Sequence, residues 1–344
     1  MPMAATVVPR RPPIWLGLLI LYLVWGSTYL GIAIAIDTIP PFLMAAMRFL
    51  IAGGVLLAWS VAREGGSFRP PSVREWRDST IVGALLLGGG MGMVAYGEQT
   101  VPSGITALFI AMMPVWVAVL GRIFLGERLP RLAVIGIVLG FAGVAILVGP
   151  SAFGGAGALD PLGLAAILVS PIAWAGGSLF ASHQASLPRR PLVATGAQMT
   201  AGAVILLGMS LVSGELAGFQ IAAISLDSLL AMGYLTVIGS LLAFTAFGWL
   251  LRVAPLPLIA TYAYVNPVVA VILGALVLGE PIELRTLVAG GVIIAAVAII
   301  VTARGRMQAP RRQPAAVAAV AGAAAPAVTD ATGTHHAAAP ARTH

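Results

Sequence analysis

The stretch PSGITALFIAMMPVWVAVLGRIFLGE, residues 102–127, recurs in this chain as PLPLIATYAYVNPVVAVILGALVLGE, residues 255–280. When residue 102 is aligned with residue 255, nine of the 26 positions are identical without a gap. The identities include two prolines, and each copy ends in Leu-Gly-Glu. A duplicated apolar unit predicts a membrane protein built from internal repeats, an architecture typical of transporters.

The composition supports a membrane environment. Hydrophobic residues make up 59% of the chain and charged residues only 9%, with a mean hydropathy of +1.00. A soluble domain carries about 25% charged residues, so this chain lacks the polar residues needed to cover a surface that faces water. Cys is absent, which excludes disulfides and Cys-ligated metals. The net charge of +7 comes from Arg in short loops and tails, so topology explains it better than a nucleic-acid partner.

Apolar runs of about 20 residues can cross a bilayer as helices. They predict an all-α integral membrane protein, because continuous runs of this length do not suit barrel strands. The ten predicted transmembrane helices cover residues 14–36, 40–62, 79–99, 104–124, 132–149, 160–181, 193–213, 228–250, 255–278 and 285–302.

The distribution of Arg predicts the orientation in the membrane. With the N-terminus inside, 17 Arg residues fall on the inner side and only Arg285 falls on the outer side, while Arg48 lies within a span. Positive residues concentrate in cytoplasmic loops. Both termini are therefore expected in the cytoplasm, in a multi-pass protein of a bacterial inner membrane, the source being inferred from an Ala- and Gly-rich composition without Lys.

The repeat divides the chain into domains. We expect a cytoplasmic segment at 1–13, a first five-helix repeat at 14–149 and an external linker at 150–159. A second five-helix repeat follows at 160–302, and then a disordered cytoplasmic tail at 303–344, rich in Ala, Pro and Arg. His335 and His336 are interpreted as part of this tail rather than as metal ligands. Because five is an odd number of spans, the two copies cross the membrane in opposite directions, which is an inverted-topology repeat.

Four motifs resemble the EamA-type branch of the drug/metabolite transporter superfamily. They are WGSTY at 25–29, PPFLMAAMRFL at 40–50, VPSGITAL at 101–108 and ATYAYVNPVVAVILGALVLGE at 260–280, within a match over about residues 14–302. This resemblance implies ten helices in two inverted halves, a central cavity and alternating access. It also implies export of metabolites, amino acids or toxic compounds.

Arg48 is the most unusual candidate residue. It lies eight residues after Pro40, or about 12 Å along a helix at 1.5 Å per residue, and therefore near the bilayer midplane. A charge at that depth costs at least about 2.5–3.5 kcal/mol. Arg48 could bind a substrate carboxylate or gate the cavity, or it could be a structural brace that pairs with Glu98 or with helix carbonyls. Glu98 could itself be a proton-coupling carboxylate or an interfacial loop residue.

The other candidates for a substrate cavity are aromatic and polar residues within spans. Trp25, Ser27 and Tyr29 lie midway along the first span, and Trp174 and Ser178 lie in the sixth. Tyr262 and Asn266, four residues apart on one helix face, replace Phe109 and Met113 of the first copy. For each group the alternative is helix packing or local hydrogen bonding to helix carbonyls.

The leading functional hypothesis is a secondary transporter that exports a small organic solute, such as an amino acid, metabolite or amphipathic drug. An importer or exchanger, a passive channel and a membrane scaffold are the alternatives. No Walker, H-E-x-x-H or G-x-S-G motif occurs, so neither ATP hydrolysis nor another enzymatic activity is expected. No cofactor or metal is expected. The expected partners are a small-molecule solute and membrane lipid, with a homodimer left open.

Overall fold

The computed structural model describes residues 14–149, 160–254, 256–259 and 261–308. These residues are helical without any strand, which confirms the predicted fold class. Nine of their helical segments are long and apolar enough to cross a membrane, and Tyr262–Leu278 is a shorter apolar helix. The predicted linker at 150–159 and most of the predicted tail, including His335 and His336, lie outside the described residues.

The helices of the first half form five membrane-crossing segments. They are α1 Ile14–Ile20 with η1 Leu21–Trp25 and α2 Gly26–Ala35; α3 Pro41–Glu64, followed by the short η2 Gly65–Ser67; α4 Val73–Gly83 with η3 Ala84–Gly92 and α5 Met93–Gly97; α6 Ser103–Ile110 with α7 Met113–Leu125; and α8 Arg131–Val148.

The second half repeats this order. Its helices are α9 Pro161–His183; α10 Pro191–Val212, followed by the short η5 Ile221–Ala223; α11 Leu226–Tyr234 with η6 Leu235–Leu242 and α12 Ala243–Val253; α13 Leu256–Ile259 with α14 Tyr262–Leu278; and α15 Leu284–Gln308.

Three expected boundaries need correction. The third span begins at Val73 rather than at 79, because Ser72 and Glu75 form a capping box that starts a helix in a polar stretch. The fourth span is not one helix, since α6 ends at Ile110 and α7 begins at Met113. The last helix continues to Gln308, so the first residues of the predicted tail are helical.

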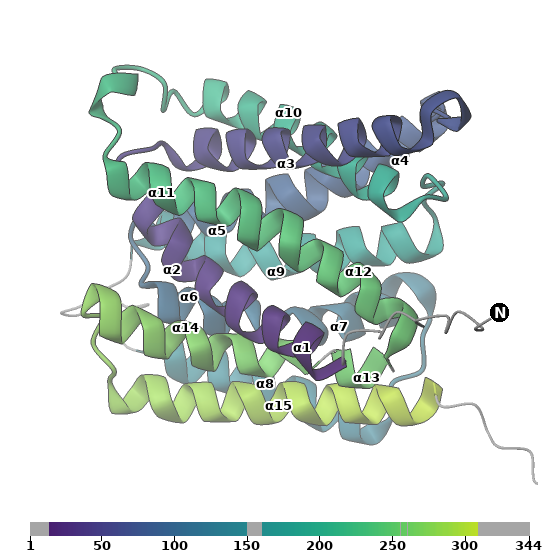
Figure 1. Cartoon of the computed structure of the whole chain (residues 1–344). Helices are drawn as coiled ribbons and strands as arrows, with labels where there is room; N and C mark the ends of the chain where they lie inside the picture. Colours follow the sequence, from purple (N-terminus) through teal and green to yellow (C-terminus); the bar gives the residue numbers. More distant parts are fainter. Residues whose placement is uncertain (1–13, 150–159, 255, 260, 309–344) are drawn as a thin grey trace, which may run out of the picture. The chain divides into compact units, whose positions relative to one another are not determined.

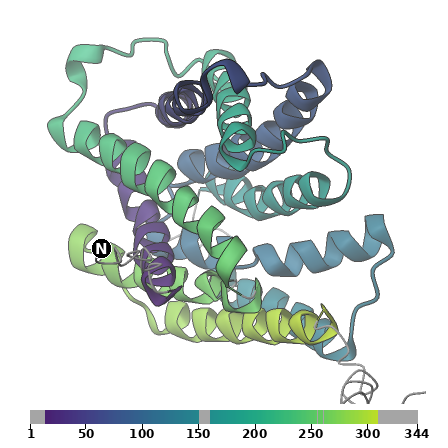
Figure 2. The same cartoon turned by 45° about the vertical axis from the view of Figure 1, so that its right-hand side comes forward.

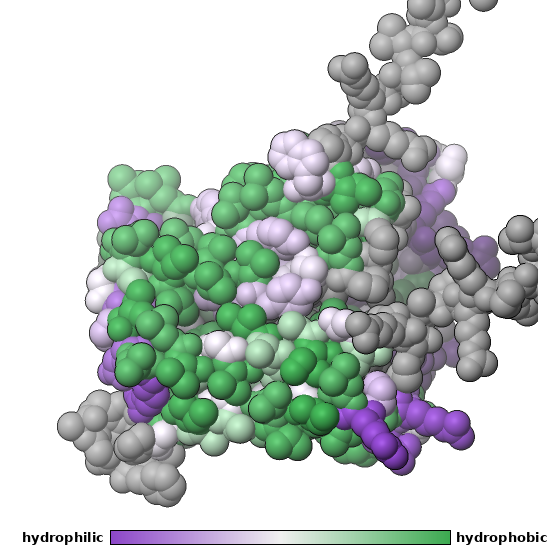
Figure 3. Space-filling view, turned by 90° about the horizontal axis from the view of Figure 1, so that it is seen from below, coloured by the Kyte–Doolittle hydropathy of each residue, from purple (hydrophilic) through white to green (hydrophobic). Residues whose placement is uncertain are grey.

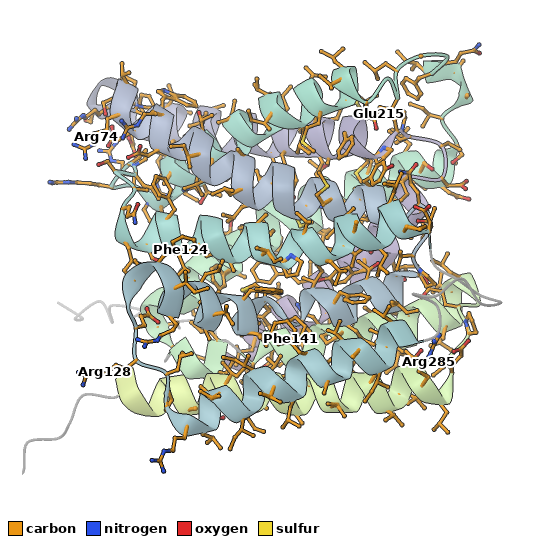
Figure 4. The ribbon with its side chains drawn as sticks, turned by 180° about the vertical axis from the view of Figure 1, so that it is seen from behind. Arg74, Phe124, Arg128, Phe141, Glu215 and Arg285 are labelled. Carbon is orange, nitrogen blue, oxygen red and sulfur yellow. The ribbon has the colours of Figure 1, made fainter. Side chains whose placement is uncertain are left out.

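The two copies run in opposite directions. Figure 4 labels Arg74 and Arg128 at one end of the helices and Glu215 and Arg285 at the other. The fourth span leads to Arg128, whereas its copy, the ninth span, leads toward Arg285. We refer to these ends as the Arg74 end and the Glu215 end. The opposite directions confirm the inverted repeat predicted from the odd number of spans.

Helices of each half pack against helices of the other half. Helix α2 of the first half packs against α11 and α14 of the second, and α9 of the second half packs against η3 and α7 of the first. Helices α3 and α10, which correspond to each other in the two halves, pack together on one side of the bundle, opposite α14 and α15 (Figures 1 and 2). The centre of the bundle is therefore surrounded by helices from both halves.

The lateral surface is apolar. Figure 3 shows a largely hydrophobic face, with hydrophilic residues mainly toward its two sides. Large side chains on this surface, such as Leu287 and Val288 of α15 and Ile135 and Val138 of α8, are exposed. An exposed apolar surface of this extent is expected where lipid, rather than water, is the solvent.

The contact between α3 and α10 depends on glycine. A Cβ atom added to Gly53 would lie 2.8 Å from Thr200 N and 2.9 Å from Gly196 O, whereas a Cβ on the next residue, Gly54, would meet nothing within 4 Å. Small residues allow helix backbones to approach this closely in membranes.

We therefore expect Gly53→Ala to destabilise the protein by about 1–3 kcal/mol, because backbone atoms cannot move aside as a side chain can. Gly54→Ala is the matched control. It should leave stability unchanged or raise it by up to about 1 kcal/mol through helix propensity. Thermal unfolding of the purified variants measures both changes, and equal melting temperatures would contradict the close packing.

The Leu-Gly-Glu end of each copy has a structural role. Gly126 and Gly279 have φ of 65° and 68°, values that favour glycine. Glu127 N donates to Gly121 O, and Glu280 N donates to Gly274 O, both at 3.2 Å. The Glu280 carboxylate then accepts hydrogen bonds from Ser103 N and Oγ, both at 2.7 Å, and from Gly104 N at 3.0 Å. It thus caps the first turn of α6.

Replacing Glu280 with glutamine should lower the free energy of unfolding by about 1–2 kcal/mol, because the cap loses its charge and one acceptor at a helix N-terminus. Glu283→Gln, at a residue whose side chain is 56% exposed, should change it by less than about 0.5 kcal/mol. Thermal or denaturant unfolding compares the two. A larger loss in Glu283→Gln would refute the capping role.

Candidate functional site

A cavity of about 110 Å³ lies between the two halves. Its walls come from the first, second, third, fourth, sixth, eighth and ninth spans. The lining residues are Trp25, Thr28, Tyr29, Arg48, Phe49, Met91, Val94, Ala107, Ile110, Ala111, Met113, Ser170, Pro171, Trp174, Phe244, Tyr262, Ala263, Asn266 and Pro267. The lining is mostly apolar, with a few polar groups, as is typical of sites for small molecules.

Irregular helix segments surround this cavity. Trp25 ends the π-helical η1, and Met91 lies in the π-helical η3. The break between α6 and α7 places Ala111 at the wall. π-Helical turns are rare and are found mostly at functional sites. Non-helical backbone at membrane depth is tolerated where it lines a cavity.

Arg48 is buried, with 3% of its surface exposed. Its Nε donates to Ser240 Oγ at 2.9 Å, and its guanidinium carbon lies 4.9 Å from the centroid of the Phe49 ring. Within the described part of the chain, Arg48 forms no ion pair with a carboxylate. The cavity therefore contains a positive charge whose hydrogen-bond partner among the described residues is the neutral Ser240.

Pairing with Glu98 was one alternative for Arg48, and no such ion pair occurs among the described residues. Ser240, from the eighth span, takes the place of Glu98 as partner, because its neighbour Gly239 leaves room for the guanidinium: a Cβ there would lie 3.2 Å from Arg48 Nη2. Glu98 is also buried, at 8% exposure, and neither of its carboxylate oxygens has a hydrogen-bond partner. It follows the third span directly and does not line the cavity.

Aromatic rings form one wall. The Trp25 ring lies 5.0 Å from Tyr262 and 5.5 Å from Phe244, in edge-on arrangements, and 5.3 Å from Phe247. Gly26 allows this wall to form, because a Cβ there would lie 2.6 Å from Val269 Cβ of α14. Edge-on contacts each contribute about 0.5–1.5 kcal/mol beyond the burial of area. The wall joins the first span to the eighth and ninth.

The structure brings six of the eight predicted cavity residues to the lining: Trp25, Tyr29, Arg48, Trp174, Tyr262 and Asn266. Ser27 and Ser178 are not there. Ser27 Oγ donates to Val24 O at 2.9 Å and contacts Tyr234 Oη at 2.6 Å. Ser178 Oγ donates to Trp174 O at 2.8 Å. Both hydroxyls are satisfied by helix carbonyls, which is the packing alternative that the sequence left open.

Asn266 is the polar counterpart of Met113, and both line the cavity. The Asn266 side-chain oxygen is buried without a hydrogen-bond partner, an arrangement that is uncommon in folded proteins. Phe109, the counterpart of Tyr262, is 1% exposed in a hydrophobic core and does not line the cavity. The polar groups of the site therefore come unequally from the two halves.

Sequence reasoning missed most of the apolar lining, including Phe49, Met91, Val94 and Phe244. Apolar residues in a membrane span carry no signal that separates a cavity wall from a lipid-facing or core position. The π-helical stretches also depart from 3.6 residues per turn. A 3.6-residue period therefore cannot predict which of their residues face the cavity.

Comparison with known proteins decides the family. The model of the EamA-like transporter family matches this chain twice, at residues 13–149 and 161–302. The chain belongs to the EamA-like transporter family. The two matches coincide closely with the two five-helix halves.

Two relatives of this EamA-like protein carry the name transporter. It is 38% identical over 290 residues to a protein of Escherichia coli K12 named uncharacterized inner membrane transporter YedA, covering 84% of this chain and 90% of the relative. It is 28% identical over 295 residues to the uncharacterized transporter YvbV of Bacillus subtilis, covering 84% and 91%. A solved structure matches with a TM-score of 0.58 at 20% identity, over 86% of this chain and 98% of the other, which supports the fold. This chain is accordingly a multi-pass membrane transporter.

Proposed function

We propose that this transporter exports a small organic solute bearing a carboxylate through the central cavity by alternating access. The observation that carries the proposal is Arg48, a buried cation that lines the cavity and bonds to Ser240. A carboxylate offers an Arg side chain the charged, two-oxygen partner that it binds best. The free-energy cost of removing the guanidinium from water is then offset by its bonds to the bound solute.

The remaining lining defines the rest of the solute. Trp25, Trp174 and Met91 provide an apolar and aromatic wall, and the unpartnered oxygen of Asn266 can accept a hydrogen bond from an N–H or O–H group. The volume of about 110 Å³ is below the roughly 300–1,000 Å³ of sites for drug-sized ligands. A small amphipathic acid or amino acid therefore fits this conformation better than a large drug.

Contacts at both ends of the helices suit a rocking motion. At the Glu215 end, Glu215 accepts hydrogen bonds from Leu43 N at 2.7 Å and Phe42 N at 3.3 Å, and so joins the loop after α10 to α3. At the Arg74 end, Glu64 of α3 pairs with Arg190 before α10, and Asp78 of α4 accepts from Ser186 N at 2.7 Å. Opening one end would break its own set of contacts and leave the other set intact.

Orientation is part of the proposal. The Arg-rich loops lie toward the Arg74 end. By the positive-inside rule, we assign this end to the cytoplasmic side of a bacterial inner membrane. Export then means uptake of solute at the Arg74 end and its release at the Glu215 end. Import or exchange uses the same cavity in the reverse or in both directions.

Counterflow in proteoliposomes tests the function. Vesicles containing the purified protein are loaded with an equimolar mixture of amino acids or, separately, of aliphatic and aromatic monocarboxylates, and uptake of labelled tracers of the same mixture is followed. Saturable, protein-dependent counterflow is expected for at least one mixture. Counterflow of neutral or cationic solutes only would refute the carboxylate assignment, and ohmic single-channel current would favour a channel. Uptake into inside-out against right-side-out membrane vesicles then separates export from import.

A further inference from the structure

Glu98 is a buried acid that the proposed solute site does not use. It directly follows the third span, is 8% exposed, and has no hydrogen-bond partner on either carboxylate oxygen. Its backbone N–H donates to Val94 O at 2.9 Å, one helical turn away, and Val94 lines the cavity. Glu98 therefore lies about 6 Å along the helix from Val94 in the cavity wall, toward the Glu215 end.

The helices that pack near Glu98 carry several charged and titratable groups, of which two interact with it. Tyr29 of α2 and Glu280 after α14 interact electrostatically with it. Asp160 at the start of α9 bonds to Gly163 N at 2.7 Å and to Thr100 Oγ1 at 3.5 Å. Helix α3, which packs against α5, carries Arg48, and Arg48 bonds to Ser240. Glu215 bonds to the start of α3. None of these groups forms a hydrogen bond or ion pair with Glu98 in the part of the chain that the structure describes.

This environment favours the neutral acid. A buried carboxylate without a hydrogen-bond donor loses its hydration and gains nothing in return. Burial, and then the neighbouring Glu280 carboxylate, raise the pKa of Glu98 well above its usual range. Burial therefore favours the protonated form of Glu98 in the described conformation. Water that reaches it when either end of the bundle opens would stabilise the charged form and release that proton.

We propose that Glu98 is the proton-binding site through which a transmembrane pH gradient drives this transporter. The inference rests on the proposed function, because a coupled proton needs a transported solute. For export, one proton binds Glu98 from the Glu215 end, is released toward the Arg74 end, and solute moves in the opposite direction. No bond other than the carboxyl O–H forms or breaks.

Transport under a pH gradient tests the coupling. Proteoliposomes are given the same two mixtures of amino acids or monocarboxylates, once in counterflow without a pH gradient and once with a gradient of about one unit, which can drive about tenfold accumulation at one proton per solute. Wild type is expected to accumulate solute under the gradient. Glu98→Gln is expected to keep counterflow and lose the accumulation. Glu283→Gln, which removes an exposed carboxylate that pairs with Arg285, is the matched control and should behave as wild type.

Thermal stability gives a second readout that needs no transport. Because the pKa of Glu98 is raised in the folded protein, stability that is present below the unfolded pKa is lost as the pH rises toward the folded pKa. The melting temperature of Glu98→Gln should therefore exceed that of wild type increasingly from pH 5 upward, while Glu283→Gln shows no such trend. Glu98→Leu, neutral and suited to an unpartnered site, gives the same comparison if Glu98→Gln fails to fold.

The outcomes separate the two proposals. Absence of counterflow in wild type overturns the proposed function, and the stability comparison then still decides whether Glu98 binds a proton. If wild type shows counterflow, and Glu98→Gln or Glu98→Leu accumulates solute under the gradient as wild type does, the role of Glu98 is overturned. A melting-temperature difference that does not change with pH overturns it as well.

Discussion

Replacing Arg48 with methionine is expected to abolish solute transport while the protein remains folded. Arg48 is the cation among the described residues that line the cavity. Under the proposed function, its loss removes a charged hydrogen bond to the solute carboxylate. Truncating one partner of a buried charge pair costs about 2–5 kcal/mol, so binding should weaken by about 30-fold to several thousand-fold. Methionine has a similar length and no charge to desolvate, and such replacements of buried charges are often neutral or stabilising.

Two further variants distinguish solute binding by Arg48 from a purely structural role. Arg48→Lys keeps the charge but not the planar, two-pronged geometry, and should retain a small part of the transport rate. Ser240→Ala removes the hydrogen-bond partner at 2.9 Å and leaves the charge, so it should reduce transport much less than Arg48→Met does. Counterflow rates and melting temperatures are measured for all three. Full transport in Arg48→Met would mean that Arg48 is only a structural brace.

Trp25→Ala is expected to lower both stability and solute affinity. The ring contacts Tyr262, Phe244 and Phe247 and lines the cavity. Removing a packed aromatic side chain costs about 3–5 kcal/mol, and the enlarged cavity no longer holds the apolar part of the solute. The affinity is read from the rise in melting temperature that each solute mixture produces, since a ligand that binds the folded state stabilises it.

Trp116→Ala is the matched control for this prediction. Trp116 makes an edge-on contact with Phe141 at 5.4 Å, packs against a hydrophobic core and does not line the cavity. Its replacement should lower stability by a similar mechanism while the solute still raises the melting temperature as in wild type. An equal loss of the solute effect in both variants would refute a specific role of Trp25 in binding.

The prolines, glycines and glutamates of the repeat predicted more of the fold than of the site. The Leu-Gly-Glu endings mark where α7 and α14 stop, because a left-handed glycine and a hydrogen bond back to Gly121 or Gly274 are fixed by residues a few positions apart. The copies nevertheless differ in where their helices break. The first copy breaks after Ile110, whereas the second is helical at the matching positions and begins α14 at Tyr262.

Some residues of the site were predicted from their residue type and their depth in a span. Arg48, Trp25 and Asn266 stand out because polar or bulky residues at membrane depth need a cavity or a partner. Ser27 and Ser178 stood out by the same criterion, yet each hydroxyl bonds to a carbonyl of its own helix. Residue type alone does not separate the two cases.

The amino-acid sequence by itself determined the membrane environment, the inverted duplication and the approximate spans, because hydropathy and local backbone chemistry depend on residues close together in the chain. Only the tertiary structure decided which polar groups meet. Ser240 reaches Arg48 across 192 residues, and Glu280 caps a helix that begins 177 residues earlier, at Ser103. Those contacts depend on how the helices of one half pack against those of the other.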